Sequence, residues 1–114
     1  MYPKRKLRRM IKAGEYSKAL AFGKSIESRH ADDHDFMFIM GSAYFIVDDP
    51  EKAMPYFENA LRLDENDVET LTLKTNAHLA LQQKSEAIDC CERILVLQPQ
   101  NDEAIYLLEQ LKDV

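Results

Sequence analysis

Apolar side chains recur along this chain every three or four residues, in segments separated by short polar turns. That spacing places them along one face of an α-helix, and no segment shows the alternation that predicts a β-strand. Turn residues mark helix starts: at Asp49-Pro50 an N-cap residue precedes a proline that suits the first helical turn. We predict an all-α protein with helices over residues 3–13, 15–29, 34–47, 50–63, 67–81, 84–97 and 101–112.

A longer period underlies these helices. Ala19, Ala53 and Ala87 stand 34 residues apart, and similar residues surround each of them. A fixed period of this size indicates a stack of similar supersecondary units. Because one helix pair of this length cannot bury its own apolar face, neighbouring pairs must share a continuous core. Small residues mark the expected close helix crossings: Gly41, Ala43, Ala53 and Ala60.

The middle unit shows the recurring pattern most fully, as Met37-x2-Met40-Gly41-x2-Tyr44 followed by Ala53-x3-Phe57. The third unit keeps Ala87-x3-Cys91 and Pro99 in the same frame. This pattern resembles the tetratricopeptide repeat, W-x2-L-G-x2-Y, A-x3-F and a closing proline, over the whole chain. The resemblance implies a right-handed α-solenoid of antiparallel helix pairs. It implies one domain, 1–114, with about three repeats, approximately 1–33, 34–67 and 68–101, and a C-terminal capping helix over 101–112.

Tetratricopeptide proteins hold a peptide in a concave groove lined by the first helix of each pair. The period places Asp35, Phe38, Ile39, Ser42, Phe45 and Ile46 on this groove in the second unit. In the third unit it places Glu69, Thr72, Leu73, Asn76, Leu79 and Ala80 there. Helices that are apolar on two faces need a second cover, which is either a ligand or an adjacent helix of the stack. We predict these peptide-binding residues: Phe38, Ile39, Ser42, Phe45, Ile46, Leu73, Asn76 and Leu79, with Lys4 and Arg8.

One subgroup of this family binds chaperones by clamping their acidic C-terminal tails with Lys, Asn and Arg side chains. At the corresponding places this chain has Lys4, Arg8, Ile39, Glu69 and Leu73. Only Lys4 matches, and the carboxylate of Glu69 would repel an acidic tail. We therefore expect no binding of such tails.

Charge is distributed unevenly. The net charge is −5, yet residues 1–14 carry six Lys or Arg and no acid, while residues 15–114 carry 9 basic and 20 acidic side chains. An acidic body disfavours nucleic acid as a partner. Lys4, Arg8 and Lys12 form a basic line on the first helix, which is either a solvated edge or a lip that guides an acidic partner. Membrane docking is the weaker alternative, because little apolar area accompanies these charges.

Candidate chemistry is sparse. His30 to Asp35 gathers two histidines and three aspartates, a set that predicts a helix-capping turn, with a weak metal site as the alternative. Adjacent Cys90 and Cys91 point in different directions on a helix, so we predict a buried Cys91 with no disulfide. His78 is expected to pack between helices with a local partner for its ring. No catalytic, cofactor or metal site is predicted, and the chain is not expected to be an enzyme.

Pro55 lies inside the predicted helix over 50–63 and cannot donate a backbone hydrogen bond to the carbonyl of Glu51. In a helix interior this costs roughly 3 kcal/mol. The 34-residue period places Pro55 on the outer, convex side, so we expect a bend in the helix and not a break.

These patterns predict a non-catalytic module that binds a peptide segment or a protein partner through apolar anchors. An adaptor or scaffold is the leading function; a chaperone that shields an apolar segment of a secreted client and a homo-oligomerisation domain are the alternatives. The chain has no run of 18 apolar residues, and no apolar segment follows its basic start, so we expect a cytoplasmic protein. The sequence does not identify the partner.

Overall fold

The computed structural model of the protein describes residues 2–112. Seven α-helices and one 3₁₀ helix fill this part of the chain, which contains no strand. The elements are α1 (Pro3–Lys12), α2 (Tyr16–Ile26), η1 (Glu27–His30), α3 (His34–Ile46), α4 (Pro50–Leu63), α5 (Val68–Ala80), α6 (Lys84–Leu97) and α7 (Asp102–Lys112). The all-α prediction is confirmed, and the predicted helix bounds agree to within a few residues. The difference lies in 15–29, where the α-helix ends at Ile26 and its last turn is the 3₁₀ helix η1.

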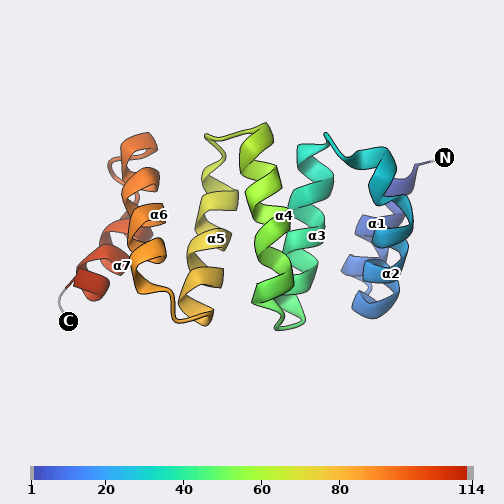
Figure 1. The fold of residues 1–114 in the computed structure, drawn as a ribbon, viewed down its shortest axis with the longest axis horizontal. Coiled ribbons are helices and arrows are strands. Elements are labelled where there is room, and N and C mark those ends of the chain that lie inside the picture. Colours follow the sequence, from blue (N-terminus) through green and yellow to red (C-terminus); the bar gives the residue numbers. More distant parts are fainter. Residues whose placement is uncertain (1, 113–114) are drawn as a thin grey trace.

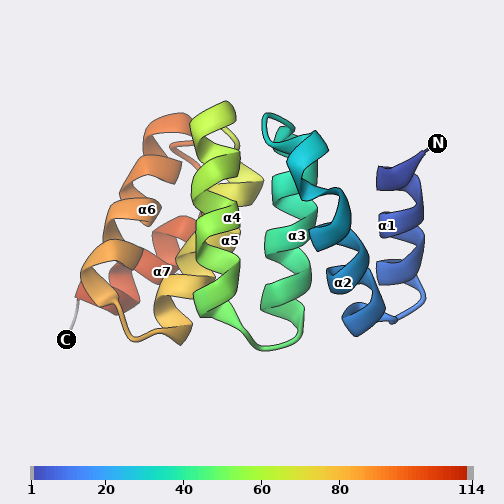
Figure 2. The same ribbon diagram turned by 45° about the vertical axis from the view of Figure 1, so that its right-hand side comes forward.

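The helices follow one another in chain order as a stack measuring 48 × 24 × 20 Å. Figure 1 shows α1 and α2 at one end of the stack and α6 and α7 at the other, with consecutive helices antiparallel. The view turned by 45° keeps this order (Figure 2). Helix α3 contacts both α1 and α5 as well as its neighbours along the chain. Helices α1, α3 and α5 therefore share one side of the stack, as the first helices of successive pairs should.

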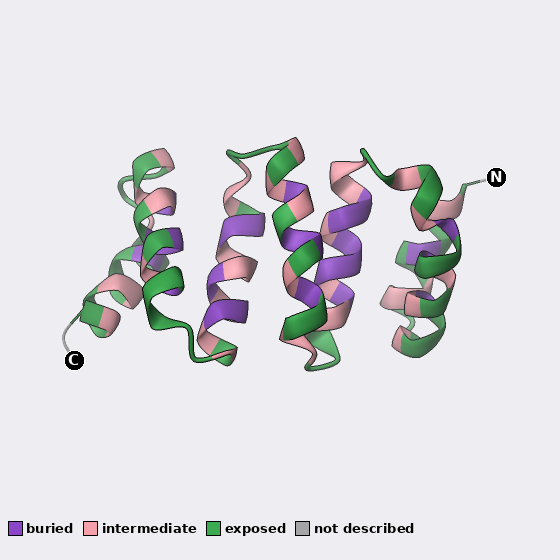
Figure 3. Cartoon of the chain, in the orientation of Figure 1, coloured by how far each residue is buried: buried purple, intermediate pink, exposed green. Residues whose placement is uncertain are grey.

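The core consists of three clusters of buried side chains along the stack. The first cluster contains Leu7, Phe36 and Met40, each fully buried. The second cluster is built on Phe57, and the partly buried Tyr44 packs against both of these clusters. The third cluster joins α5, α6 and α7 through Leu71, Ile94 and Ala104. Figure 3 shows the buried residues gathered on the middle helices and green, exposed residues dominating the two ends.

The small residues lie where helices α3 and α4 cross. Ala43, Ala53 and Ala60 are fully buried, as predicted for a close crossing. At Gly41 the approach is tightest: a Cβ atom there would lie 2.6 Å from Cε1 of the Phe57 ring. That distance is far below van der Waals contact, so the crossing requires glycine in α3 opposite the phenylalanine in α4.

The backbone conformation also repeats every 34 residues. Gly14, Asp48 and Gln82 stand 34 residues apart, and each has a positive φ, of 77°, 65° and 60°. The following residue in each turn donates its backbone N–H to a carbonyl five residues earlier, at 2.8–2.9 Å. These Schellman-type turns end α1, α3 and α5 in the same way, and each one leads the chain into the next helix.

Pro55 is exposed and lies inside α4, which runs unbroken from Pro50 to Leu63. The absence of a break agrees with the prediction. We expect Pro55→Ala to raise the free energy of unfolding by about 0.5–2 kcal/mol, because it restores a backbone donor at an exposed site. Urea denaturation of both proteins measures this difference. A loss of stability would mean that the packing of α4 depends on the proline.

Candidate functional site

A groove of about 590 Å³ opens between α1 and α3, on the side of the stack that α1, α3 and α5 share, which we call the inner side. Its lining combines cationic side chains from α1 with largely apolar ones from α3. The lining residues are Arg5, Arg8, Arg9, Ile11, Lys12, Phe38, Ile39 and Ser42. Four of the predicted site residues, namely Arg8, Phe38, Ile39 and Ser42, are thus brought together.

Helix α3 supplies the floor because it is apolar nearly all round. Phe36, Met37 and Met40 point into the first core cluster, and Phe38 lies half-buried on the groove side. Ile39 is only 8% exposed and belongs to the core cluster, although it also lines the groove. Most of the Ile39 side chain is therefore covered by the stack itself, which was the alternative to a ligand.

The other predicted site residues lie outside this groove. Phe45 and Leu73 pack, partly buried, against the second core cluster around Phe57. Ile46, at the end of α3, is 52% exposed. Asn76 and Leu79 lie half-buried on α5. A role for these five residues in peptide binding stays a prediction.

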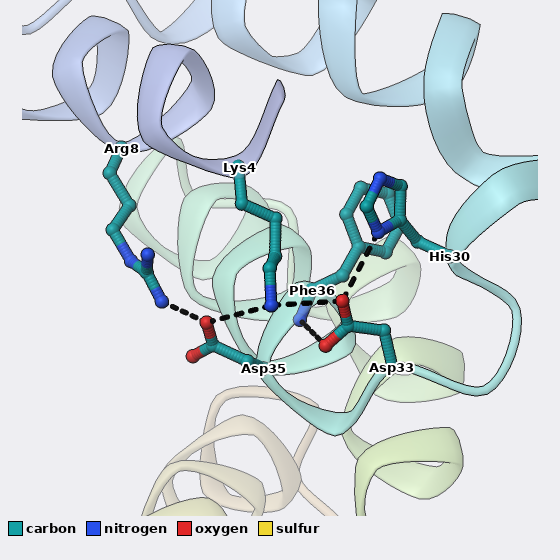
Figure 4. Close-up of polar contacts among 6 residues, drawn as sticks. All are labelled: Lys4, Arg8, His30, Asp33, Asp35 and Phe36. Carbon is teal, nitrogen blue, oxygen red and sulfur yellow. Dashed lines mark hydrogen bonds and ion pairs between the residues drawn. The ribbon is translucent and has the colours of Figure 1, made fainter. Parts of the chain in front are cut away.

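Lys4 and Arg8 are held by carboxylates at the start of α3. Lys4 Nζ lies 3.0 Å from Asp33 Oδ2 and 3.5 Å from Asp35 Oδ2. The Arg8 guanidinium donates to the same Asp35 oxygen. Figure 4 shows the Lys4 ammonium between the two carboxylates, with Arg8 on the far side of Asp35. Much of the charge of this pair is therefore neutralised within the chain.

The turn before α3 is the helix-capping turn that the sequence predicted. Asp33 accepts the backbone N–H of Phe36 at 3.2 Å, and its other oxygen lies 3.1 Å from His30 Nδ1. Burial alone would raise the pKa of Asp33, but its bonds to Lys4, His30 and the Phe36 N–H outweigh burial and lower it. The His30 ring stacks on Phe36 at 5.0 Å between centroids (Figure 4). Through Asp33 the turn thus links Lys4 of α1 and His30 of η1 to the first turn of α3.

The remaining groove cations have different surroundings. Arg5 lies over the Tyr2 ring, 4.8 Å from its centroid. Within residues 2–112, neither Arg9 nor Lys12 has a carboxylate partner. The Ser42 hydroxyl oxygen is buried and has no hydrogen-bond partner among the described residues.

The sequence prediction omitted Arg5, Ile11 and Lys12 from the groove-lining set. Each precedes by 34 residues a position of α3 that the sequence prediction placed on the groove, namely Ile39, Phe45 or Ile46. The period therefore contained the signal, had it been extended from the second unit to the first. Arg9 has no such counterpart, because the equivalent position of α3 is the buried Ala43.

The other candidate residues are structural. His78 is 7% exposed, and its Nδ1 lies 2.8 Å from Gln83 Oε1, so it packs between helices with a local partner as predicted. Cys90 and Cys91 are buried free thiols, and burial raises the pKa of both. Among the described helices, none is long and apolar enough to span a membrane.

Comparisons with known proteins agree with this architecture. Residues 44–111, more than half of the chain, match the family model of the tetratricopeptide repeat. The first such domain of Spaghetti (RPAP3), solved with the HSP90 peptide SRMEEVD, is 25% identical with a TM-score of 0.86, over 97% of this chain and 88% of that chain. The first domain of human RPAP3 is 26% identical with a TM-score of 0.79, over 98% and 88%.

A third structure shares the fold alone. The Yersinia enterocolitica type III secretion chaperone SycD, in complex with a peptide of the translocator YopD, is 14% identical with a TM-score of 0.86, over 96% of this chain and 89% of that chain. No curated protein matches the sequence. The family match, the similarity of the solved folds and the 34-residue period in both side chains and backbone lead to one conclusion: the chain belongs to the tetratricopeptide repeat family.

Proposed function

We propose that the chain is a non-catalytic adaptor whose inner side binds a peptide segment of a protein partner. The family is a protein-interaction family, and the groove between α1 and α3 is the observation that carries the proposal. Phe38 presents a half-buried aromatic ring on the floor of this groove. Fully burying a phenylalanine side chain is worth about 1.5–3 kcal/mol, so an apolar anchor of a partner gains the part that the half-buried ring has not yet contributed, together with the burial of the anchor's own surface.

The related structures support peptide binding without naming the peptide. The Spaghetti domain was solved with an HSP90 peptide, and SycD with a translocator peptide. In this chain Lys4 is engaged by Asp33 and Asp35, and Leu73 packs against the second core cluster. We therefore propose a partner other than an acidic chaperone tail. The partner that we propose is a protein, and not a nucleic acid or a membrane.

The chaperone and homo-oligomer alternatives stay predictions, as do the cytoplasmic location and the division into repeats. The likeness to SycD concerns the fold and does not favour one of these functions over another.

We expect Phe38→Ser to weaken peptide binding at least tenfold, or by about 1.4 kcal/mol, because it removes the aromatic ring from the apolar floor of the groove. The probe is a peptide selected by the unmodified protein from a phage-displayed random library and titrated by calorimetry. Val96→Ser is the matched control, because Val96 is 70% exposed on α6, outside the groove.

A melting curve for each variant separates binding from folding. Phe38→Ser should cost much less stability than a substitution of the fully buried Phe57. The proposal fails if both serine variants bind the peptide as the unmodified protein does. It also fails if Phe38→Ser unfolds the protein, since Phe38 would then belong to the core.

A further inference from the structure

We infer, on the basis of the proposed function, that the groove between α1 and α3 selects acidic and apolar peptide segments. In this inference Arg9 and Lys12 bind carboxylates of the segment, while Phe38 and its neighbours cover its apolar side chains. The carboxylates are side chains within the segment and not a chain terminus.

The cations form one edge of the groove. Arg5, Arg8, Arg9 and Lys12 follow the spacing i, i+3, i+4 and i+7 on α1, and all four line the groove. Residues at this spacing share one face of a helix and extend over about 10 Å along it. A bound segment lying along α1 can therefore meet successive cations with successive acidic side chains.

These cations are not equally available. Arg8 is bound to Asp35, and Arg5 lies over the Tyr2 ring. Arg9 and Lys12 are exposed and lack a carboxylate partner within residues 2–112. The half of the edge toward the C-terminal end of α1 thus retains its positive charge, and a carboxylate placed there gains attraction that Lys4 and Arg8 no longer offer.

A buried hydroxyl in the same groove is an independent sign of a ligand. Ser42 Oγ has no hydrogen-bond partner among the described residues, although its solvent exposure is negligible. A buried polar atom without a partner costs free energy, and native proteins seldom leave one. Ser42 lines the groove beside the Phe38 and Ile39 floor, and rotation of its side chain about Cα–Cβ would turn the hydroxyl toward a carboxylate or carbonyl of a bound segment.

A peptide fits these surroundings better than a nucleic acid. Phosphate backbones need an extended basic surface, yet residues 15–114 carry 20 acidic and only 9 basic side chains. The basic edge is short, and next to it lie the apolar floor of Phe38 and Ile39 and the side chain of Ile11 from α1. Alternating carboxylates and apolar side chains complement both features at once.

The test uses fluorescence polarisation with a labelled peptide Glu-Leu-Glu-Glu-Leu-Glu whose ends are both blocked. Two matched peptides replace either every Glu by Gln or every Leu by Ser. We expect both matched peptides to bind at least tenfold more weakly, and the binding of the acidic peptide to weaken with added salt. Blocked ends exclude recognition of a terminal carboxylate.

The protein variants locate the charge contact. The double variant Arg9→Gln with Lys12→Gln should bind the acidic peptide at least tenfold more weakly and the Gln peptide unchanged. Its control, Lys6→Gln with Lys18→Gln, changes net charge equally but leaves the groove intact, since Lys6 lies over the Phe22 ring and Lys18 on α2. Ser42→Ala should weaken binding severalfold without lowering the melting temperature.

Failure of this inference is distinguishable from failure of the proposed function. If Phe38→Ser abolishes peptide binding while the Arg9 and Lys12 variant binds normally, charge selection is wrong and the groove remains a peptide site. If neither change affects binding, both are wrong. A single-stranded DNA oligonucleotide that binds more tightly than the acidic peptide, and competes with it, would also overturn the inference.

Discussion

We expect Phe57→Ala to lower the free energy of unfolding by about 3–5 kcal/mol, the largest effect of any single change considered for this protein. Phe57 is fully buried and forms the second core cluster with Ala53 and Ala77. Its ring also fills the space left by the missing side chain of Gly41. Because the cluster joins α3, α4 and α5, a cavity there weakens contacts between two helix pairs and not only within one.

Urea denaturation followed by circular dichroism measures this loss, with Phe38→Ala as the matched control. The two substitutions remove the same atoms, yet Phe38 is half-buried at the groove. The control should therefore lose distinctly less stability. Equal losses would show that the inner side of α3 is as much a part of the core as the α3–α4 crossing.

The sequence predicted the helices well because their ends carry local signals. The carboxylates of Asp33, Asp49 and Asp67 each accept a backbone N–H in the first turn of the next helix. Such caps depend on residues within a few positions of one another, so a single sequence contains them. The close crossing was also readable, because Ala53 recurs as Ala19 and Ala87, and Gly41 stands where the repeat pattern has its glycine.

Two features could not be read in this way. Asp48 and Gln82 have a positive φ that is usual for glycine, and only the comparison with Gly14, one and two periods earlier, relates them to a glycine position. The contacts of Lys4 with Asp33 and Asp35 join residues that are distant in the chain and meet only when α1 lies beside α3. A line of cations on a helix was predictable, but which of them remain unpaired was not.

That distinction changes the interpretation of the basic first helix. The sequence predicts one basic line of Lys4, Arg8 and Lys12, which is either a solvated edge or a lip that guides an acidic partner. In the structure Lys4 and Arg8 of this helix form ion pairs with carboxylates at the start of α3. Arg9 and Lys12, nearer the C-terminal end of the helix, have no carboxylate partner among the described residues and line the apolar groove. Partly exposed ion pairs at the surface contribute roughly 0–1 kcal/mol each, so the attachment of α1 to α3 depends mainly on Leu7, which is fully buried in the first cluster.

We expect Gly41→Ala to lower the free energy of unfolding by about 1–3 kcal/mol, although alanine is the better helix former. The added Cβ would lie 2.6–2.7 Å from two ring atoms of Phe57, and a rigid ring in a packed cluster can move only together with α4. The higher helix propensity of alanine offsets about 0.5–1 kcal/mol, which is less than the cost of the overpacking.

Gly23→Ala is the matched control, since it makes the same chemical change within α2. There the added Cβ would meet Sδ and Cε of Met40, at 2.2 and 2.9 Å, which form the end of a flexible side chain. Methionine can adopt another rotamer at small cost, so we expect a change within about 1 kcal/mol of zero. Thermal denaturation of both variants measures the contrast. If Gly23→Ala lowers the stability more than Gly41→Ala does, the packing of α2 on α3 tolerates an added methyl group less well than the crossing of α3 with α4, which contradicts the prediction.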